Sequence, residues 1–325
     1  MAGSMTDELD AVKVLGAFIA LIWLLSHLPQ RAAAGQSRWL PSTDNAAKRQ
    51  FEQWALGYSA VWISAFGVVV VTKAYQRFDA NSYMALCTTL ALPYLLQPLV
   101  YPLPAEKNLP LWLRYSFKAN LWVAIFSFIG NYWYTHYFYS VLQARYTFPS
   151  HRLNNVPIAL FFATHFYFVT YHSLSNVILR KVETTFRPSA SRSLLFWAVV
   201  FGFAYFTAFM ETLTISSYEH YSFSRPKSWI YQIGSAFYGI YFIVSFPVFF
   251  RLDEHVSALA GGASAGAESA ESGNKPHTVF QTIMEVMGSG MIVLLLLDFS
   301  RLALGVDLNI PGLAYCQNET GRQCR

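Results

Sequence analysis

Apolar runs of about twenty residues recur along almost the whole chain, and they constrain its fold more than any other feature. A run of this length spans a bilayer as an α-helix, because a helix rises about 1.5 Å per residue. The runs lie near residues 11–28, 54–75, 83–103, 117–141, 157–179, 193–216, 228–250 and 279–304. We therefore predict an all-α fold, a polytopic transmembrane helical bundle with about 7–8 spans.

The composition supports an integral membrane protein. Of the 325 residues, 54% are hydrophobic and only 13% are charged, a balance that is rare in water-soluble domains of this length. The net charge of +5 does not indicate nucleic-acid binding, because the Lys and Arg residues are scattered through short loops between the runs. The predicted partner is the lipid bilayer.

The ends of the chain and one loop are predicted to lie outside the membrane domain. Asp7, Glu8 and Asp10 precede the first run against a single Lys13, the wrong sign for a signal peptide, so a signal anchor is favoured. We expect an N-terminal extension over 1–36, a membrane domain over 37–316 and a tail over 317–325. The Ala/Gly/Ser/Glu-rich segment 257–276 is predicted to be a disordered loop.

No sequence pattern indicates a metal or a cofactor. Cys87, Cys316 and Cys324 form no CxxC pair, and no HExxH spacing is present. Phosphate loops, nucleophile elbows and dinucleotide fingerprints are also absent from the sequence. We expect chemistry that uses side chains alone.

The stretch 117–157 is the leading candidate for the working part of the protein. Its apolar portion carries Asn120, Asn131, Thr135 and His136, and an unpaired polar group in hydrocarbon costs several kcal/mol. These groups are expected to face other helices or a cavity. The surrounding rings that would line such a cavity include Tyr132, Trp133 and Tyr137.

A second group of polar residues lies within the run 157–179. His165, His172 and Asn176 are spaced by seven and four residues, which places them on one helical face. Each histidine has two interpretations: a neutral ring hydrogen-bonded to a neighbouring helix, or a proton-handling group that acts together with His136.

Among the residues of the predicted spans, Glu211 has the highest free-energy cost of transfer into the membrane. Thr207, Thr214 and Tyr218 share its helical face, and desolvation is expected to keep the carboxyl protonated at neutral pH. The residue is therefore either a proton donor or a structural carboxyl paired across a helix contact.

The remaining polar positions near the ends of the runs have ordinary structural interpretations. Asn154 and Asn155 predict a turn, although their amides would also suit a pocket mouth. Asp253 and Glu254 are expected to be solvated or paired at the surface. Asp298 and Arg301 are predicted to form an ion pair three residues apart.

Several runs in this sequence resemble the plant cycloeucalenol cycloisomerase family, the cyclopropyl sterol isomerases. The resemblance extends from about Trp39 to about Cys316, while the first 36 residues and the long loop depart from the family pattern. The similar runs are KANLW (118–122), GNYWYTHYF (130–138), YTFPS (146–150), NNVP (154–157), THFYFVTYHSLSN (164–176), YGIYFIVSFPVFFRLDE (238–254) and DFSRLALG (298–305).

The resemblance implies a reaction and a location. Family members open the 9β,19-cyclopropane ring of cycloeucalenol to give obtusifoliol, a Δ8 sterol, without a cofactor. C19 gains a proton, positive charge develops at C9 and the C8 proton leaves. The resemblance also implies a multi-pass protein of the endoplasmic reticulum membrane, working in sterol biosynthesis.

This chemistry requires an acid, a base and a dry site that tolerates a cation. Glu211 would be the acid, and a histidine would be the base, with the two roles interchangeable. The candidate bases are His172, His136 and His165. Ring faces at Tyr132, Trp133, Tyr137 and Tyr238 would stabilise the cation, and Asn154, Asn155 or Asn176 would bind the sterol hydroxyl. Asn131 and Tyr218 complete the candidate substrate-binding residues.

Two other functions fit parts of the same pattern. A non-catalytic sterol-binding or transfer protein would also have an aromatic pocket, but it would not need Glu211 together with intramembrane histidines. An isomerase that moves a double bond in a sterol without a cyclopropane would need the same acid and base.

Overall fold

The structure of the protein, a computed structural model, describes residues 2–216, 218–255 and 275–307. The fold is all-α, as predicted. The longer helices are α1 (Ala2–Leu25), α2 (Ala46–Val71), α3 (Ala80–Val100), α4 (Tyr115–Ile129), α5 (Thr135–Val141), α6 (Ile158–Thr185), α7 (Ala190–Ser216), α9 (Ser235–Arg251) and α10 (Val279–Ala303). Short helical segments are η1 (Ala74–Arg77), η2 (Pro104–Glu106), η3 (Leu111–Leu113), η4 (Gly130–Tyr134), α8 (Lys227–Trp229) and η5 (Ile230–Gly234).

The helical segments coincide with the eight apolar runs, and the chain is a multi-pass membrane protein. Within the described residues, five segments are long and apolar enough to cross a bilayer by length and composition alone: α2, α3, α7, the continuous rod 227–251 and α10. The rod 115–141 and helix α6 run in the same bundle but carry many polar side chains. The apolar part of α1, Ala11–Leu25, is shorter. The count of seven or eight spans is therefore approximate.

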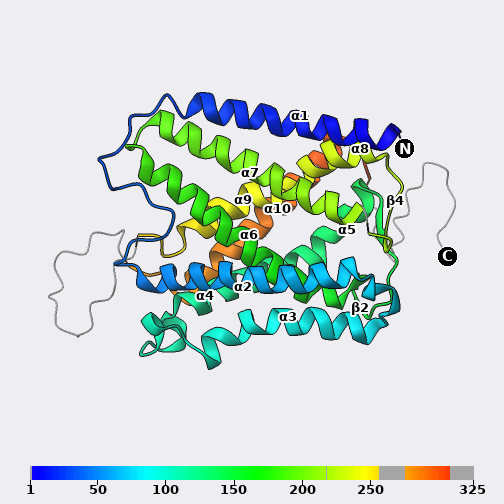
Figure 1. The fold of residues 1–325 in the computed structure, drawn as a ribbon, viewed down its shortest axis with the longest axis horizontal. Helices are drawn as coiled ribbons and strands as arrows, with labels where there is room; N and C mark the ends of the chain where they lie inside the picture. Colours follow the sequence, from blue (N-terminus) through cyan, green and yellow to red (C-terminus); the bar gives the residue numbers. More distant parts are fainter. Residues whose placement is uncertain (1, 217, 256–274, 308–325) are drawn as a thin grey trace, which may run out of the picture.

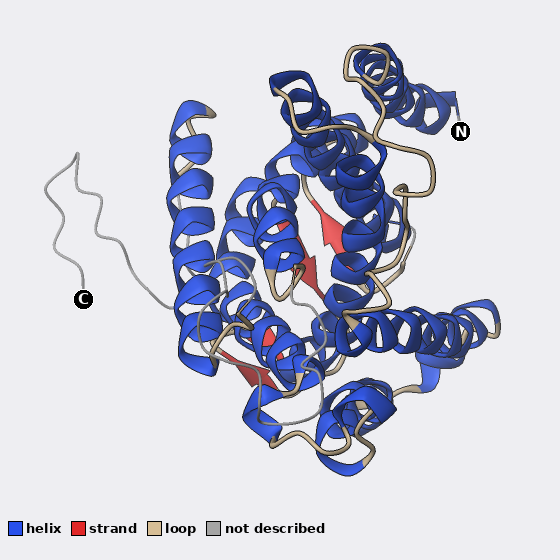
Figure 2. Cartoon of the chain, turned by 90° about the vertical axis from the view of Figure 1, so that its left-hand side faces the viewer, coloured by secondary structure: helices blue, strands red, loops and turns tan. Residues whose placement is uncertain are grey.

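Helix α6 lies at the centre of the bundle. It packs against α2, α3, α4, α7 and α9, while α10 packs against α4 and α9. Helix α1 runs along α7 on one side of the molecule, and α2 and α3 lie on the opposite side (Figure 1; Figure 2). Side chains on different faces of α6 therefore meet different neighbours.

Among the described residues, two π-helical turns interrupt the rods 115–141 and 227–251. Segment η4 joins α4 to α5, and η5 joins α8 to α9. Each contains a glycine, and a methyl group on Gly234 would approach Leu142 Cγ to 3.4 Å. Such turns shift the register of the side chains that follow, and they are frequent at functional sites.

Short strands cover one end of the bundle. Strand β1 (Ala144–Tyr146) pairs antiparallel with β4 (Tyr221–Phe223), at the right of Figure 1. Strands β2 (Arg152–Leu153) and β3 (Val156–Pro157) form a hairpin. Its turn residues Asn154 and Asn155 have φ values of 50° and 60°, which confirms the predicted turn, because asparagine tolerates this left-handed conformation.

A buried charge network closes the opposite end of the bundle. Arg180 is 1% exposed, and its guanidinium donates to both carboxylate oxygens of Glu52 at 2.8 Å and to those of Glu254 at 2.6 and 2.7 Å. The Lys48 ammonium lies 2.8 Å from Glu254. The prediction of a solvated or surface-paired Glu254 is therefore wrong, because this residue folds back onto the cations of α2 and α6.

Asp253 belongs to the same end of the bundle and is also buried. Its carboxylate is paired with the fully buried Lys118 ammonium, and its Oδ1 lies 3.0 Å from His277 Nδ1. The prediction of a solvated Asp253 is likewise wrong. Near the other end of α10, Arg301 Nε donates to Asp298 Oδ1 at 2.6 Å, which confirms the predicted ion pair.

The N-terminal extension contacts the bundle. Phe18 and Ile22 of α1 lie against Gly202 of α7, where an added methyl group would meet Ile22 Cδ1 at 3.0 Å. The interpretation of this helix as a signal anchor stays a prediction. Most of the loop 257–276 and all of the tail 317–325 lie outside the described residues.

Candidate functional site

Glu211 lies on α7, at the end of the bundle that carries strands β1 and β4. Its carboxylate is partly exposed and accepts a hydrogen bond from the Tyr238 hydroxyl of α9 at 3.0 Å. The Tyr171 side chain of α6 lies beside the same carboxyl group. Three helices therefore converge on one carboxyl group.

Tyrosine rings surround this carboxyl group. Six tyrosines lie within electrostatic range of it: Tyr146, Tyr167, Tyr171, Tyr221, Tyr238 and Tyr241. All except Tyr241 are partly exposed. The rings of Tyr146 and Tyr221 are 5.1 Å apart across the β1–β4 pair, and those of Tyr238 and Tyr241 are 5.0 Å apart. The set presents both phenol groups and aromatic faces.

The side chains that were expected to share the Glu211 face do not bond its carboxylate. The Thr207 hydroxyl donates to the Phe203 carbonyl within α7, and the Thr214 hydroxyl donates to the backbone carbonyl of Glu211. Helical spacing placed these threonines correctly along α7. A threonine inside a helix usually bonds its own backbone, however, so the carboxyl finds its partners on other helices.

Tyr218 lies just beyond α7 and next to the tyrosine set. Its hydroxyl lies 3.0 Å from the hydroxyl of Tyr83, whose ring is 7% exposed. Tyr221 is within electrostatic range of both Tyr218 and Glu211. The two hydroxyl groups of Tyr83 and Tyr218 therefore form a polar pair close to the carboxyl site.

His165 and His172 are buried and hydrogen-bonded to other parts of the bundle. His165 Nε2 lies 3.1 Å from Asn120 Oδ1 of α4. His172 Nε2 lies 2.9 Å from the Ser245 hydroxyl of α9, and its Nδ1 lies 2.7 Å from the Phe168 carbonyl. Both arrangements correspond to the structural interpretation of these histidines.

His136 is buried on α5, away from α6. Within the described part of the chain, neither of its ring nitrogens has a hydrogen-bond partner of acceptable geometry, although the side chain of Asn154 lies beside it. Its ring contacts that of Tyr139 at 5.7 Å. His136 keeps its hydrogen-bonding capacity, but the structure does not bring it together with His165 or His172.

The polar and aromatic residues of η4 and α5 point in different directions and do not line one cavity. Asn131 is buried between the Ser127 carbonyl and the Thr164 hydroxyl. Tyr132 stacks on Phe128, and Trp133 is 52% exposed, so it points away from the interior.

Three further candidates are held elsewhere. The Tyr137 hydroxyl donates to Asp298 at 3.5 Å. Asn154 Nδ2 donates to the Tyr132 carbonyl, and the Asn155 carbonyl accepts from Tyr139, so both asparagines serve the β2–β3 turn.

Asn176 belongs to the charge network. Its Nδ2 donates to Glu52 Oε1 at 2.9 Å. The stripe formed by His165, His172 and Asn176 therefore contacts three different helices, α4, α9 and α2, and does not line one site, because α6 is surrounded on several sides. No group of three or more His, Cys, Asp or Glu side chains in the described ranges is arranged to hold a metal ion.

The residues missed from the sequence are the tyrosines that meet Glu211 from α6 and the strands. Tyr167 and Tyr171 are four residues apart and share a helical face, with ring centroids separated by 5.9 Å. This spacing is visible in the sequence, but the two tyrosines lie in the same segment as His165 and His172, which drew attention to a different face of the helix. Tyr146 and Tyr221 meet only through strand pairing between residues far apart in sequence.

Comparison with known proteins identifies the family of this chain. It is 36% identical over 282 residues to the cycloeucalenol cycloisomerase of Arabidopsis thaliana, and the match covers 86% of this chain and 94% of that relative. The chain belongs to the cycloeucalenol cycloisomerase family. No family model matches the chain, and no solved structure matches it.

Family membership confirms the resemblance seen in the sequence. Two of the runs that carry the resemblance to the cycloeucalenol cycloisomerases supply partners of Glu211: the run 164–176 holds Tyr171, and the run 238–254 begins with Tyr238. A third, the run 118–122, begins with Lys118 of the charge network. The family pattern thus extends over both ends of the bundle.

Proposed function

We propose that this protein is an isomerase that opens the 9β,19-cyclopropane ring of cycloeucalenol, or of a related cyclopropyl sterol, to give a Δ8 sterol. Membership of the cycloeucalenol cycloisomerase family supports the reaction. The single structural observation that carries the proposal is the Glu211 carboxyl, which accepts a hydrogen bond from Tyr238 inside a tyrosine-lined part of the bundle.

Glu211 acts as the general acid. Its protonated carboxyl gives a proton to C19, and the electron pair of the C9–C19 bond forms the new C–H bond of the angular methyl group. Positive charge then develops at C9. Loss of the C8 proton supplies the electron pair of the C8–C9 double bond. One proton enters and one leaves, so the reaction consumes no cofactor.

The tyrosine set stabilises the cation at C9. A cation over an aromatic face gains about 1–2 kcal/mol when both are desolvated. Tyr171 and Tyr238 come from different helices and both meet the carboxyl, so they present rings where the charge develops. The β1–β4 pair places Tyr146 and Tyr221 over the same region.

The carboxylate left after the first step serves as the base. C8 and C19 are both bonded to C9, so one carboxylate reaches both positions with little movement. His172 does not suit this role, because both of its ring nitrogens are engaged within the core. Transfer of the C8 proton to Glu211 restores the carboxylic acid, and because the side chain is partly exposed, its proton exchanges with water before the next turnover.

The Tyr83–Tyr218 pair binds the 3-hydroxyl of the sterol in this proposal. Paired phenols can both accept and donate, as a single hydroxyl ligand requires. Tyr218 lies near Tyr221 and therefore near the reacting end of the site. The protein would work in the endoplasmic reticulum membrane, where its sterol substrate is embedded.

Substitution of Glu211 tests the proposal. Glu211→Gln keeps the shape of the side chain and removes its transferable proton, so we expect turnover of cycloeucalenol to fall at least 100-fold. The matched control is Glu219→Gln, an exposed glutamate whose carboxylate accepts a hydrogen bond from the Gln76 amide at 3.0 Å. Turnover of the folded Glu211→Gln protein within tenfold of the control would exclude Glu211 as the acid.

A further inference from the structure

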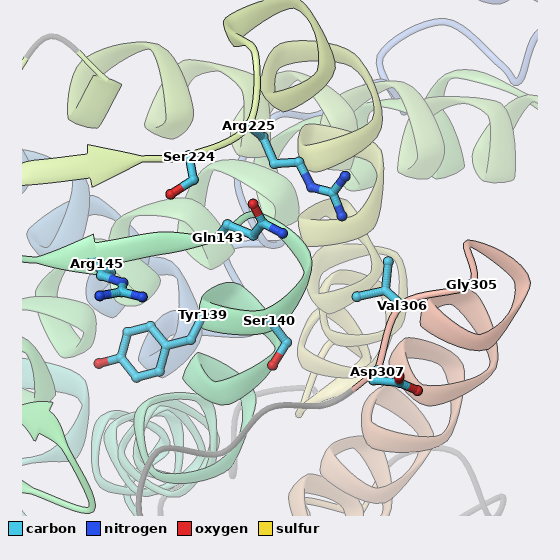
Figure 3. A pocket seen from close by; sticks show the side chains of 9 residues that line it. All are labelled: Tyr139, Ser140, Gln143, Arg145, Ser224, Arg225, Gly305, Val306 and Asp307. Carbon is cyan, nitrogen blue, oxygen red and sulfur yellow. The ribbon is translucent and has the colours of Figure 1, made fainter. Parts of the chain in front are cut away.

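A polar cavity of about 400 Å³ lies beside the outer face of the β1–β4 pair, outside the Glu211 site. Figure 3 shows the residues that line it, which come from α5, β1 and the link between them, and from the segments that follow β4 and α10. The proposed isomerisation uses none of them. Two of the lining residues are arginines, Arg145 and Arg225.

The arginines are placed to bind an anion. Arg225 lies with its guanidinium 4.8 Å from the centre of the Trp229 ring, and its Nε is buried without a hydrogen-bond partner among the described residues. Arg145 is exposed, and its neighbours Ala144 and Tyr146 point to the other face of β1. Within the described residues, neither arginine forms an ion pair with a carboxylate.

The cavity also supplies neutral donors and a defined charge. Gln143 and Ser224 line it with an amide and a hydroxyl, and the backbone amide of Ser224 already donates to the Gln143 carbonyl. Asp307 is the acidic residue of the lining. Two guanidinium groups and one carboxylate leave a net charge of +1, which matches the single negative charge of a phosphodiester.

The position of the cavity fits the level of lipid headgroups. Arg225 comes two residues before the candidate span Lys227–Arg251, and Asp307 comes four residues after the candidate span Val279–Ala303. Trp229, under the Arg225 guanidinium, is of the residue type enriched where a span meets water.

We propose that this cavity binds the phosphodiester group of a phospholipid, held mainly by Arg225 and Arg145. The guanidinium of Arg225 lies over the Trp229 ring and lines the cavity, so it can donate to the ligand. Arg145 adds a second charge-assisted hydrogen bond from the strand. The bound headgroup would hold the start of the rod 227–251 against the end of α10.

Native mass spectrometry of the full-length protein in detergent tests this proposal with three probes. Dioctanoylphosphatidylglycerol carries the phosphodiester, dioctanoylglycerol lacks it, and inorganic phosphate is added as a competitor. Arg225→Gln and Arg145→Gln remove the proposed contacts. The matched control Arg77→Gln removes the same group from an exposed position at the same end of the bundle.

We expect the wild-type protein to bind one phosphatidylglycerol per chain and to show no equivalent binding of dioctanoylglycerol. Binding of phosphatidylglycerol should be at least tenfold weaker in Arg225→Gln and Arg145→Gln and unchanged in Arg77→Gln. Equal binding by wild type and both cavity variants would overturn the proposal. If millimolar inorganic phosphate displaces the lipid completely and binds to the same arginines, the site takes free phosphate, and the assignment to a lipid is wrong.

Discussion

Removal of the Arg180 side chain is expected to destabilise the bundle strongly. In the Arg180→Gln variant, Glu52 and Glu254 lose four hydrogen bonds of 2.6–2.8 Å. Breaking a buried ion pair by removal of one partner costs about 3–5 kcal/mol. Lys48 still meets Glu254 and Asn176 still meets Glu52, so we expect a loss of about 4 kcal/mol in the free energy of unfolding.

Thermal unfolding of the purified protein in detergent measures this effect. At about 2 °C per kcal/mol for a chain of this size, the midpoint is expected to fall by about 8 °C. The matched control is Arg187→Gln, an exposed arginine shortly after α6, for which we expect a change of about 1 °C or less.

A second variant separates unpaired charge from lost packing. In Arg180→Gln, both Glu52 and Glu254 lose the guanidinium. The double variant Arg180→Gln/Glu52→Gln also removes the Glu52 charge, so only Glu254 remains without this partner and part of the lost stability is expected to return. If Arg180→Gln unfolds at the same temperature as Arg187→Gln, the network does not stabilise the fold and this reasoning is refuted.

Three further perturbations have defined outcomes. His277 is hydrogen-bonded to Asp253 and to a second carboxylate, which raises its pKa to about 9, so its stabilisation is complete below pH 6.5 and is lost as the pH rises through 9. His277→Gln should flatten this decline in the unfolding midpoint. Gly290→Leu should destabilise by about 2 kcal/mol, because even a methyl group would lie 3.2 Å from the Tyr134 hydroxyl. Tyr238→Phe removes one hydrogen bond to the catalytic carboxyl and should lower kcat about tenfold, measured by sterol analysis.

Each of these three predictions has a control or a result that would contradict it. A midpoint that falls equally between pH 6.5 and 9 in wild type and His277→Gln would assign the decline to other groups. Gly288→Leu is the matched packing control, because nothing lies within 4 Å of the position of its added carbon, and equal loss in both glycine variants would contradict the packing argument. Unchanged kcat in Tyr238→Phe would remove this hydroxyl from the chemistry.

The helices were predictable because each apolar run is long enough to specify a span. The charge network was not, because its members are separated by up to about 200 positions and meet only when five helix ends gather. The sequence nonetheless contained an indication of this network. Lys48 and Lys118 lie at the starts of helices and Arg180 lies near the end of one, and because successive spans run in opposite directions, all three residues reach the same side of the bundle.

The candidate site was predicted in part. Glu211 and Tyr238 were both identified, and the structure joins them by one hydrogen bond. The assignment of a histidine as the base stays a prediction, because helical spacing shows that residues share a face but does not show which neighbour that face meets. A central helix such as α6 meets different neighbours around its circumference, so the consecutive residues Tyr171 and His172 point toward different helices.

Conversion of cycloeucalenol by the purified protein in deuterated water, with analysis of the sterols by mass spectrometry, tests the central claim most directly. The account predicts obtusifoliol with one deuterium in its new angular methyl group, formed without added cofactor and abolished by Glu211→Gln. A product without deuterium in that methyl group, or unchanged substrate recovered from folded protein that binds it, would contradict proton-initiated ring opening by this chain.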